Sequence, residues 1–328
     1  METLITNISK AANPGAGDVY VNALLPNVAV SYFQTQGGLH TTFPSVPVSQ
    51  QTGLFAAFAR ADTMRVKTEL KAAGAGIAQI GFNTDLTGAY SCKVWEAEYA
   101  PPAEVVANYN LPLALDQSAT RLLARAAYLR RELSWVSSFF TTGIWGTDVT
   151  PTVTWDDPSS SPISDIETGI ETVLLATGMR PNVLSCGYQV WKALKQHPDI
   201  IARIGTGSSS NMDPRMVTTQ LVAALFGLDE IKVGEVVYNS AASGASISMS
   251  FAAGKNALLT YRTPTPDIMT PSAGYKFAWQ GLTGSVDGLQ VRMGVDARQD
   301  QKWYQIRHAD DFKKVASELG YFFSACVA

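Results

Sequence analysis

The most regular pattern of hydrophobic and polar positions lies in residues 116–140. Apolar residues recur there at alternating spacings of three and four, at Ala119, Leu122, Ala126, Leu129, Leu133, Val136 and Phe140. This period places the apolar side chains on one stripe of a helix and does not occur in strands. Asp116 is expected to be the N-cap, and Gly143 lies just beyond the end. The sequence therefore predicts one long helix of about 36 Å, at 1.5 Å per residue.

The residues before this helix show extended patterns. Residues 1–50 have little periodicity, and the alternating Pro44 and Pro47 are typical of an edge strand or an extended arm. In residues 51–99 an apolar run leads to a glycine-rich tip, and alternation resumes at Tyr90. This order predicts a projecting two-stranded hairpin. Because an isolated hairpin is marginal in water, we expect it to lie against something else.

Helical and extended patterns alternate after the long helix. Ser164 and Glu167 form a capping-box pattern, which predicts a helix that ends at Gly178. Further helices are predicted at residues 188–196, 198–204 and 219–226. Strands are predicted at residues 182–185, 231–239, 247–251, 257–261, 286–298, 303–308 and 320–327. This mixture, without an internal repeat, indicates an α+β protein.

Composition adds that the surface is poor in charge. The chain has 328 residues, enough for two lobes, and only 16% of them are charged, against the ~25% usual for soluble domains. Either partners cover much of the surface or a monomer has an unusually large core, and composition leaves both open. Residues 19–59 contain no Lys, Arg, Asp or Glu, but prolines and polar residues interrupt this stretch, so no membrane span is predicted.

Charge and cysteine content exclude other classes. The net charge is −3, so the chain lacks the excess of positive charge that is typical of proteins that bind nucleic acid tightly. Cys92, Cys186 and Cys326 are far apart and odd in number, so a reducing cytoplasm is expected. The first residues lack a basic segment followed by an apolar one, which argues against secretion.

No catalytic, cofactor or metal site is predicted. His40, His197 and His308 have no metal-ligand spacing, and no nucleophile elbow, zincin or phosphate-loop motif occurs. The acid pairs at residues 156–157 and 310–311 are interpreted as solvated turns, because adjacent residues of an extended chain point apart. We therefore expect a protein that is not an enzyme, with an enzyme of unrecognised site as an alternative.

The basic residues are more informative. Arg60, Arg65, Lys67 and Lys71 lie near the expected hairpin tip, where few acids oppose them. The apolar stripe of the long helix is flanked by four further arginines, Arg121, Arg125, Arg130 and Arg131. Two interpretations stay open: a solvated face, or contact with acidic groups of another chain or a polyanion.

The order of these elements resembles a known family. The most specific segments are Phe-Pro-Ser-Val-Pro-Val at residues 43–48, Asp-Gln-Ser-Ala-Thr at 116–120, Arg-Arg-Glu-Leu-Ser-Trp at 130–135, Arg-Pro-Asn-Val-Leu at 180–184, 188–198 and Val-Gly-Glu-Val-Val-Tyr-Asn at 233–239. With this order and spacing, nearly the whole chain resembles the major capsid proteins (major head proteins) of tailed double-stranded DNA bacteriophages, which have the Hong Kong ninety-seven type fold.

The resemblance implies a domain plan. Residues 1–50 would be an N-terminal arm, and residues 51–99 an extended β-hairpin loop (the E-loop). Residues 100–151 and 285–328 would form a peripheral domain with its spine helix at 116–141, and residues 152–284 an axial domain. The implied function is a structural protein that self-assembles into hexamers and pentamers of an icosahedral shell around the double-stranded DNA genome. The implied location is the virion (capsid), assembled in the host bacterial cytoplasm.

The resemblance also implies partners. These are the chain itself, a portal, packaged DNA bound non-specifically, and a separate scaffolding protein, because members with a fused scaffold carry a long extra N-terminal segment. No membrane or cofactor is implied. The expected assembly contacts are Phe43, Val46, Arg60, Arg65, Lys67, Lys71, Arg121, Arg125 and Arg131. An encapsulin-like protein compartment is the alternative with the same fold.

Overall fold

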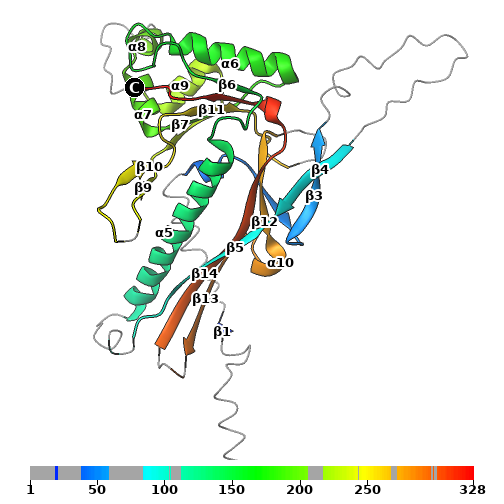
Figure 1. Cartoon of the computed structure of the whole chain (residues 1–328), viewed down its shortest axis with the longest axis vertical. Helices are drawn as coiled ribbons and strands as arrows, with labels where there is room; N and C mark the ends of the chain where they lie inside the picture. The colour runs from blue at the N-terminus through cyan, green and yellow to red at the C-terminus, as the bar shows by residue number, and fades with distance from the viewer. Residues whose placement is uncertain are drawn as a thin grey trace, which may run out of the picture.

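The chain is organised around two β-sheets and one long helix that runs from one sheet to the other (Figure 1). The computed structural model describes residues 19–20, 38–58, 84–102, 104, 112–205, 217–242, 244–266, 272–296, 298 and 301–328. None of the helices described in these ranges is long and apolar enough to span a membrane.

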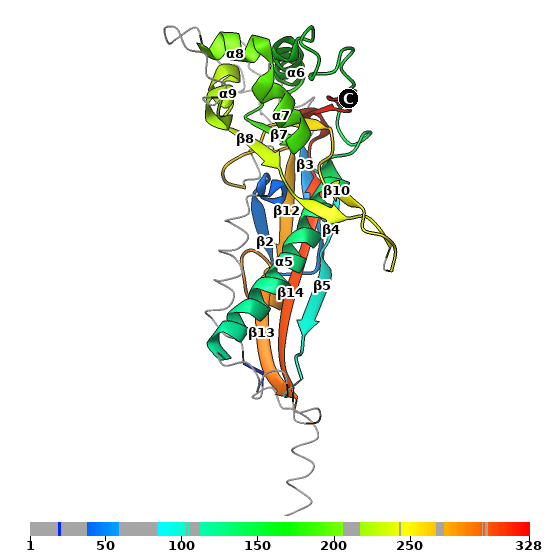
Figure 2. The same cartoon turned by 90° about the vertical axis from the view of Figure 1, so that its left-hand side faces the viewer.

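The larger sheet has six strands and is built around β14 (Gln301–Lys314). One edge of β14 pairs first with β13 (Leu289–Asp296) and then with β12 (Gly274–Trp279), while its other edge pairs with β5 (Lys93–Tyr99). The outer strands are β1 (Val19–Tyr20) beside β13 and β2 (Ser45–Val48) beside β12. The long helix α5 (Pro112–Phe139) packs along β14 and β5 (Figure 2).

The smaller sheet has five strands in the order β6 (Thr147–Val149), β15 (Gly320–Phe323), β11 (Ala257–Thr260), β7 (Val183–Gly187) and β8 (Glu230–Gly234). Its central strands are wholly buried, so they are apolar runs and not alternating ones. The accompanying helices are α6 (Pro162–Thr177), α7 (Tyr188–Gln196), α8 (Pro198–Gly205) and α9 (Thr219–Phe226). Their apolar side chains and those of the sheet form one core cluster.

Two hairpins project from this body on opposite sides in Figure 1. One consists of β3 (Thr52–Phe58) and β4 (Thr84–Ser91), with a register shift between Phe55 and Ala57. The other consists of β9 (Val237–Asn239) and β10 (Met249–Phe251). Three short helical turns complete the described part, η1 (Leu39–Thr41), α10 (Gln280–Thr283) and η3 (Ser317–Leu319).

An aromatic cluster at the C-terminal end of α5 joins the two sheets. Phe140 contacts Phe322 of β15, with ring centroids 5.6 Å apart. Phe139 contacts Phe312 of β14 at 6.2 Å and Phe43 at 4.7 Å. These buried rings form a third part of the core. We call this cluster the aromatic joint.

The long helix is confirmed, but its expected start is wrong. Helix α5 begins at Pro112, four residues before the predicted N-cap, and proline is favoured at a first helical position. The Asp116 carboxylate instead accepts hydrogen bonds from Lys302 Nζ, at 2.9 Å, and from the Tyr304 hydroxyl. Asp116 therefore ties the helix to β14.

The predicted apolar stripe agrees with the buried face only in part. Ala119 and Phe140 are buried as expected, but Leu122 is 55% exposed and Ala126 is exposed, and the residue after each of these two is buried instead. The buried side chains are Ala119, Thr120, Leu123, Ala124, Ala127, Tyr128, Arg131, Glu132, Trp135 and Phe139. Polar residues occupy part of this face because each finds a partner there, and a pattern of apolar letters alone misses them.

Other elements agree in part with the sequence. Helices α7 and α9 have the predicted bounds, and α6 and α9 end at left-handed glycines, Gly178 and Gly227. The Ser164 capping box is wrong, since α6 begins two residues earlier at Pro162. Two strands change partners: β15, expected beside the long helix, lies in the five-stranded sheet, and β12 lies in the six-stranded one.

Candidate assembly surfaces

The C-terminal half of α5 carries an ion cluster in which Arg131, Lys276 and Asp310 are buried and Asp287 is partly exposed. Arg131 Nε lies 2.5 Å from Asp310 Oδ2, and its two terminal nitrogens donate to the Asp287 carboxylate and carbonyl at 2.8 and 2.7 Å. Lys276 of β12 donates to the other carboxylate oxygen of Asp287. The cluster therefore connects α5 to β12, to β14 and to the loop before β13.

The charges of this cluster balance one another. Burial alone would lower the pKa of Arg131, but the carboxylates of Asp310 and Asp287 outweigh it and raise that pKa. Burial, with the Arg131 charge, lowers the pKa of Lys276. Burial would raise the pKa of Asp287, yet the two cations hold it well below its usual range. The cluster acts as an internal clamp, because removing one partner leaves a buried charge uncompensated.

A second carboxylate fixes the segment that precedes β2. Glu132 accepts hydrogen bonds from the backbone N–H groups of Leu39 and His40, at 2.8 and 3.0 Å, and lies 2.8 Å from His40 Nδ1. A Cβ at Gly38 would approach the Glu132 carboxylate to 2.6 Å, so this close contact favours glycine. Residues 38–41 are thereby anchored to the buried face of α5.

Two of the expected assembly contacts belong to the core of the chain. Phe43 is 3% exposed within the aromatic joint, and the Arg131 side chain is fully buried in its clamp. Neither side chain has surface to offer to another copy, so both expectations are wrong. Val46 is half-buried against the cluster around Phe277 and stays a prediction.

The other expected contacts divide in two. Arg60, Arg65, Lys67 and Lys71 lie outside the described residues. Arg121 and Arg125 are exposed on α5, one turn apart, and stay predictions. The neighbouring arginine, Arg130, lies over the Trp95 ring of β5 at 3.6 Å from its centroid, a cation–π contact within the chain.

Sequence reasoning missed two exposed apolar surfaces. One is the β9–β10 hairpin, where Ile247 is 79% and Met249 64% exposed. The other is a hollow between α6 and α9 that includes Leu174 and Leu225. A usable signal was present for the first, because residues 236–254 contain no charged residue.

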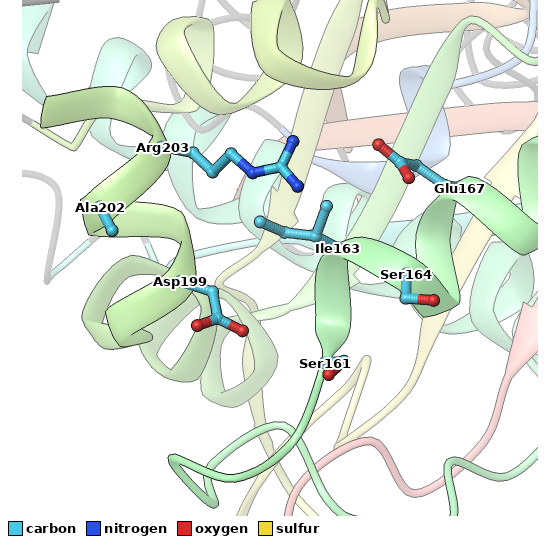
Figure 3. A pocket seen from close by; sticks show the side chains of 7 residues that line it. All are labelled: Ser161, Ile163, Ser164, Glu167, Asp199, Ala202 and Arg203. Atoms are coloured by element: carbon cyan, nitrogen blue, oxygen red, sulfur yellow. The ribbon is translucent and has the colours of Figure 1, made fainter. Parts of the chain in front are cut away.

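A further surface pocket of about 620 Å³ lies between the start of α6 and α8 (Figure 3). In Figure 3, Arg203 extends over Ile163 towards the side of the pocket that carries Glu167. Ser161 and Ser164 also line this pocket, and no hydrogen bond from either hydroxyl to a base occurs among the described residues. This arrangement supplies no activated nucleophile.

Metal and thiol chemistry are likewise not built into the described part. No group of three or more His, Cys, Asp and Glu in the described ranges is placed to hold a metal ion. All three cysteines are buried and free, and burial raises the pKa of Cys92 and Cys186 to about 12. Such thiols stay protonated at neutral pH and are poor nucleophiles.

Comparison with known proteins gives a consistent result. No protein-family profile matches the chain. The major capsid protein of Burkholderia phage BcepMu is 25% identical over 321 residues, which cover 93% of this chain and 96% of that protein. The major capsid protein of Pseudomonas phage JBD67 is 30% identical over 178 residues, 53% of each chain. The chain is similar to phage major capsid proteins over nearly its whole length.

Solved structures show that the chain has the Hong Kong ninety-seven type fold. A phage-related protein from Bordetella bronchiseptica superposes with a TM-score of 0.71 at 22% identity, over 94% of this chain and 98% of that one. A putative prophage capsid protein from Escherichia coli CFT073 superposes with a TM-score of 0.52 at 13% identity, over 93% and 99%. An encapsulin from Synechococcus elongatus is a more distant likeness, with a TM-score of 0.50 at 12% identity over 88% and 86%.

Proposed function

We propose that this chain is the major capsid protein of a tailed bacteriophage and forms the hexamers and pentamers of an icosahedral head around double-stranded DNA. The observation that carries this proposal is the alignment with a phage major capsid protein over 93% of the chain. Both listed relatives are named as capsid proteins, which supports a structural role over the enzyme alternative.

The domain plan follows the two sheets. The six-stranded sheet with α5 corresponds to the peripheral domain, and the five-stranded sheet with its helices corresponds to the axial domain. We keep the N-terminal arm (residues 1–50) and the extended loop (residues 51–99) in this plan, although β1, β2 and β5 within them pair into the six-stranded sheet. The partner changes of β12 and β15 support a boundary at which strands cross between domains. An arm, a loop and a body let each copy contact several others, so individually weak contacts add up.

The remaining partners are proposed from the same role. A head that packages DNA needs a portal, and a separate scaffolding protein would guide shell size. Location in the virion after assembly in the host cytoplasm follows. An encapsulin-like compartment shares the fold, but both capsid relatives are phage proteins, which favours a container for a genome.

Electron microscopy tests the proposal. The full chain, expressed alone and with its neighbouring genes, should yield closed shells of regular diameter. Nuclease-protected DNA in particles from an infected or induced host would support the phage head, and an enclosed enzyme without DNA would support the compartment. A chain that stays monomeric under every one of these conditions would contradict both.

A further inference from the structure

The β3–β4 hairpin begins with two glycines that face two aromatic rings. In the strand register Gly53 lies opposite Tyr90, and Phe55 lies opposite Gly88. A Cβ at Gly53 would come within 2.6 Å of the Tyr90 hydroxyl oxygen, and a Cβ at Gly88 would collide with the Phe55 ring. Each ring therefore lies over the glycine of the other strand and supplies the packing that a glycine lacks in a strand. We call these two contacts the ring–glycine pairs.

Both rings then pack on β12 of the same chain, beside which the hairpin leaves the body (Figure 1). Tyr90 stacks on Phe277 with ring centroids 4.7 Å apart, and Phe55 contacts the same ring at 5.2 Å. Phe277 is buried, and the three rings belong to one small apolar cluster. A hairpin of only two strands is marginal in water. The cluster on β12 therefore gives this hairpin the support that its own two strands cannot provide.

Hydrogen bonds hold the strands at the same level. The Cys92 N–H donates to the Gln51 carbonyl at 2.9 Å, and Gln51 Nε2 donates to the Cys92 carbonyl at 3.2 Å. The Ser91 N–H donates to the Asp311 carboxylate of β14 at 2.8 Å. The first residues of the hairpin are thus attached to β14 as well as to β12, and they cannot turn freely on the sheet.

The strand pairing becomes irregular directly beyond the rings. The register of β3 against β4 shifts between Phe55 and Ala57. An irregularity of this kind, such as a β-bulge, bends a strand and increases its twist. Because the ring–glycine pairs fix both strands just before this bend, they also define the direction that the hairpin takes after it.

We propose that the ring–glycine pairs set the direction in which the β3–β4 hairpin leaves the body, and that the contact of this hairpin with another copy requires that direction. The second half of the proposal rests on the proposed capsid function, and the first half does not. Phe55 and Tyr90 are positioning residues, since they touch β12 of their own chain. A projection that is already oriented loses less conformational freedom when it binds.

The distance between two spin labels tests the direction in the free chain. The labels are attached at Thr84→Cys, the first residue of β4, and at Val295→Cys on β13, where the side chain is exposed; the native cysteines are buried. We expect the distance distribution to broaden or shift when Phe55→Ala and Tyr90→Ala remove both rings. Phe55→Tyr with Tyr90→Phe keeps both rings and should retain the distribution of the parent.

The other face of β3 offers a matched control. Leu54→Ala truncates a side chain that is 64% exposed and should leave the distance distribution unchanged. A second label pair, Val153→Cys with Val295→Cys, should give one distance in every variant if the body keeps its fold. Gly53→Ala displaces the Tyr90 ring without truncating any side chain, and it should shift the hairpin distance as well. An unchanged hairpin distance without the rings, or the same change in Leu54→Ala, would overturn the first half of the proposal.

The yield of particles tests the second half. The chain with Phe55→Ala and Tyr90→Ala should form closed shells at about a tenth of the wild-type yield or less, since its hairpin would seldom meet its partner in the right orientation. The variant that keeps both rings should assemble normally. Normal shells from a chain whose hairpin distance has broadened would refute the need for a fixed direction. Wild-type chain that never assembles would refute the proposed function, whereas the distance in the free chain would still decide on the ring–glycine pairs.

Discussion

At the scale of single residues, the polar side chains buried under α5 are the least expected feature. Arg131 and Glu132 are adjacent in sequence, yet one clamps the sheet and the other anchors residues 38–41. From the sequence alone, Arg131 and Glu132 would be placed on a charged, solvent-exposed side of the helix. Their burial is tolerated because Arg131 pairs with two carboxylates and Glu132 accepts hydrogen bonds from two backbone N–H groups, which no local pattern reveals.

Removing the Arg131 charge should be strongly destabilising. Arg131→Met keeps the volume of the side chain but leaves Asp310 and Asp287 without their guanidinium. We expect a loss of about 3–5 kcal/mol in the free energy of unfolding, measured by urea denaturation. The control is Arg125→Met on the exposed face, for which a change within about 0.5 kcal/mol is expected. Equal effects of the two variants would contradict the clamp.

Acid should destabilise the chain partly through His308. This imidazole is buried beside Asp310 and Arg131, neither ring nitrogen has a hydrogen-bond partner in the described part, and burial lowers its pKa from 6.5 to about 4. The unfolded chain therefore binds the proton first, so stability is lost as pH falls from about 6.5 towards 4. At pH 4.5 this loss amounts to about 2 kcal/mol.

The matched variant isolates this contribution. His308→Phe removes the titrating group, so its unfolding free energy should fall less between pH 7 and pH 4.5 than that of the wild type. Asp287, whose pKa is depressed, acts in the same direction in both proteins at lower pH. The same pH dependence in variant and wild type would show that His308 does not contribute.

At the scale of elements, the structure buries some residues of α5 that the sequence pattern places on the exposed side, and this difference can be tested. Ala124 is buried against the sheet, and Ala126, two residues on, faces solvent. Ala124→Leu should therefore destabilise the chain by about 1–3 kcal/mol through overpacking. Ala126→Leu should be close to neutral in the same thermal or urea measurement. The reverse order would restore the stripe predicted from the sequence.

A sequence predicts an element well when the residues that determine it lie within that element, and poorly when they lie far away in the chain. Helices α7 and α9 were correct because proline, glycine and apolar spacing act within the element. The start of α5 was wrong because the Asp116 carboxylate bonds to β14, and that of α6 because the helix begins at Pro162 and already includes Ser164. Strand partners are non-local, so nothing within residues 320–327 indicates that they join a different sheet from β14.

The candidate surfaces follow the same rule. The exposed arginines Arg121 and Arg125 could be placed on a helix from sequence, but Phe43 could not be assigned to the core, since its partners are distant in the chain. The hairpin strands at 231–239 and 247–251 were predicted, yet the first is two strands, β8 and β9, in different sheets. The exposure of the β9–β10 hairpin could be recognised only from the structure.

At the scale of the whole molecule, the β3–β4 hairpin tests the assembly model most directly. Replacing residues 60–82 by a short Gly-Ser linker removes the segment between these strands. We expect a chain that folds and melts as the wild type does but forms few or no shells in electron microscopy, since an added contact between copies is lost. Shells of normal yield and size from this variant would refute the role proposed for the loop.

The aromatic joint has a consequence for how a flat patch of subunits becomes a closed surface. Because Phe140 and Phe322 are packed inside one buried cluster with Phe139 and Phe312, bending between the two sheets would have to disrupt close-packed rings. If the chain forms the five-fold and six-fold rings proposed above, we expect the change in curvature between them to occur at the contacts between copies and not within the body of one copy.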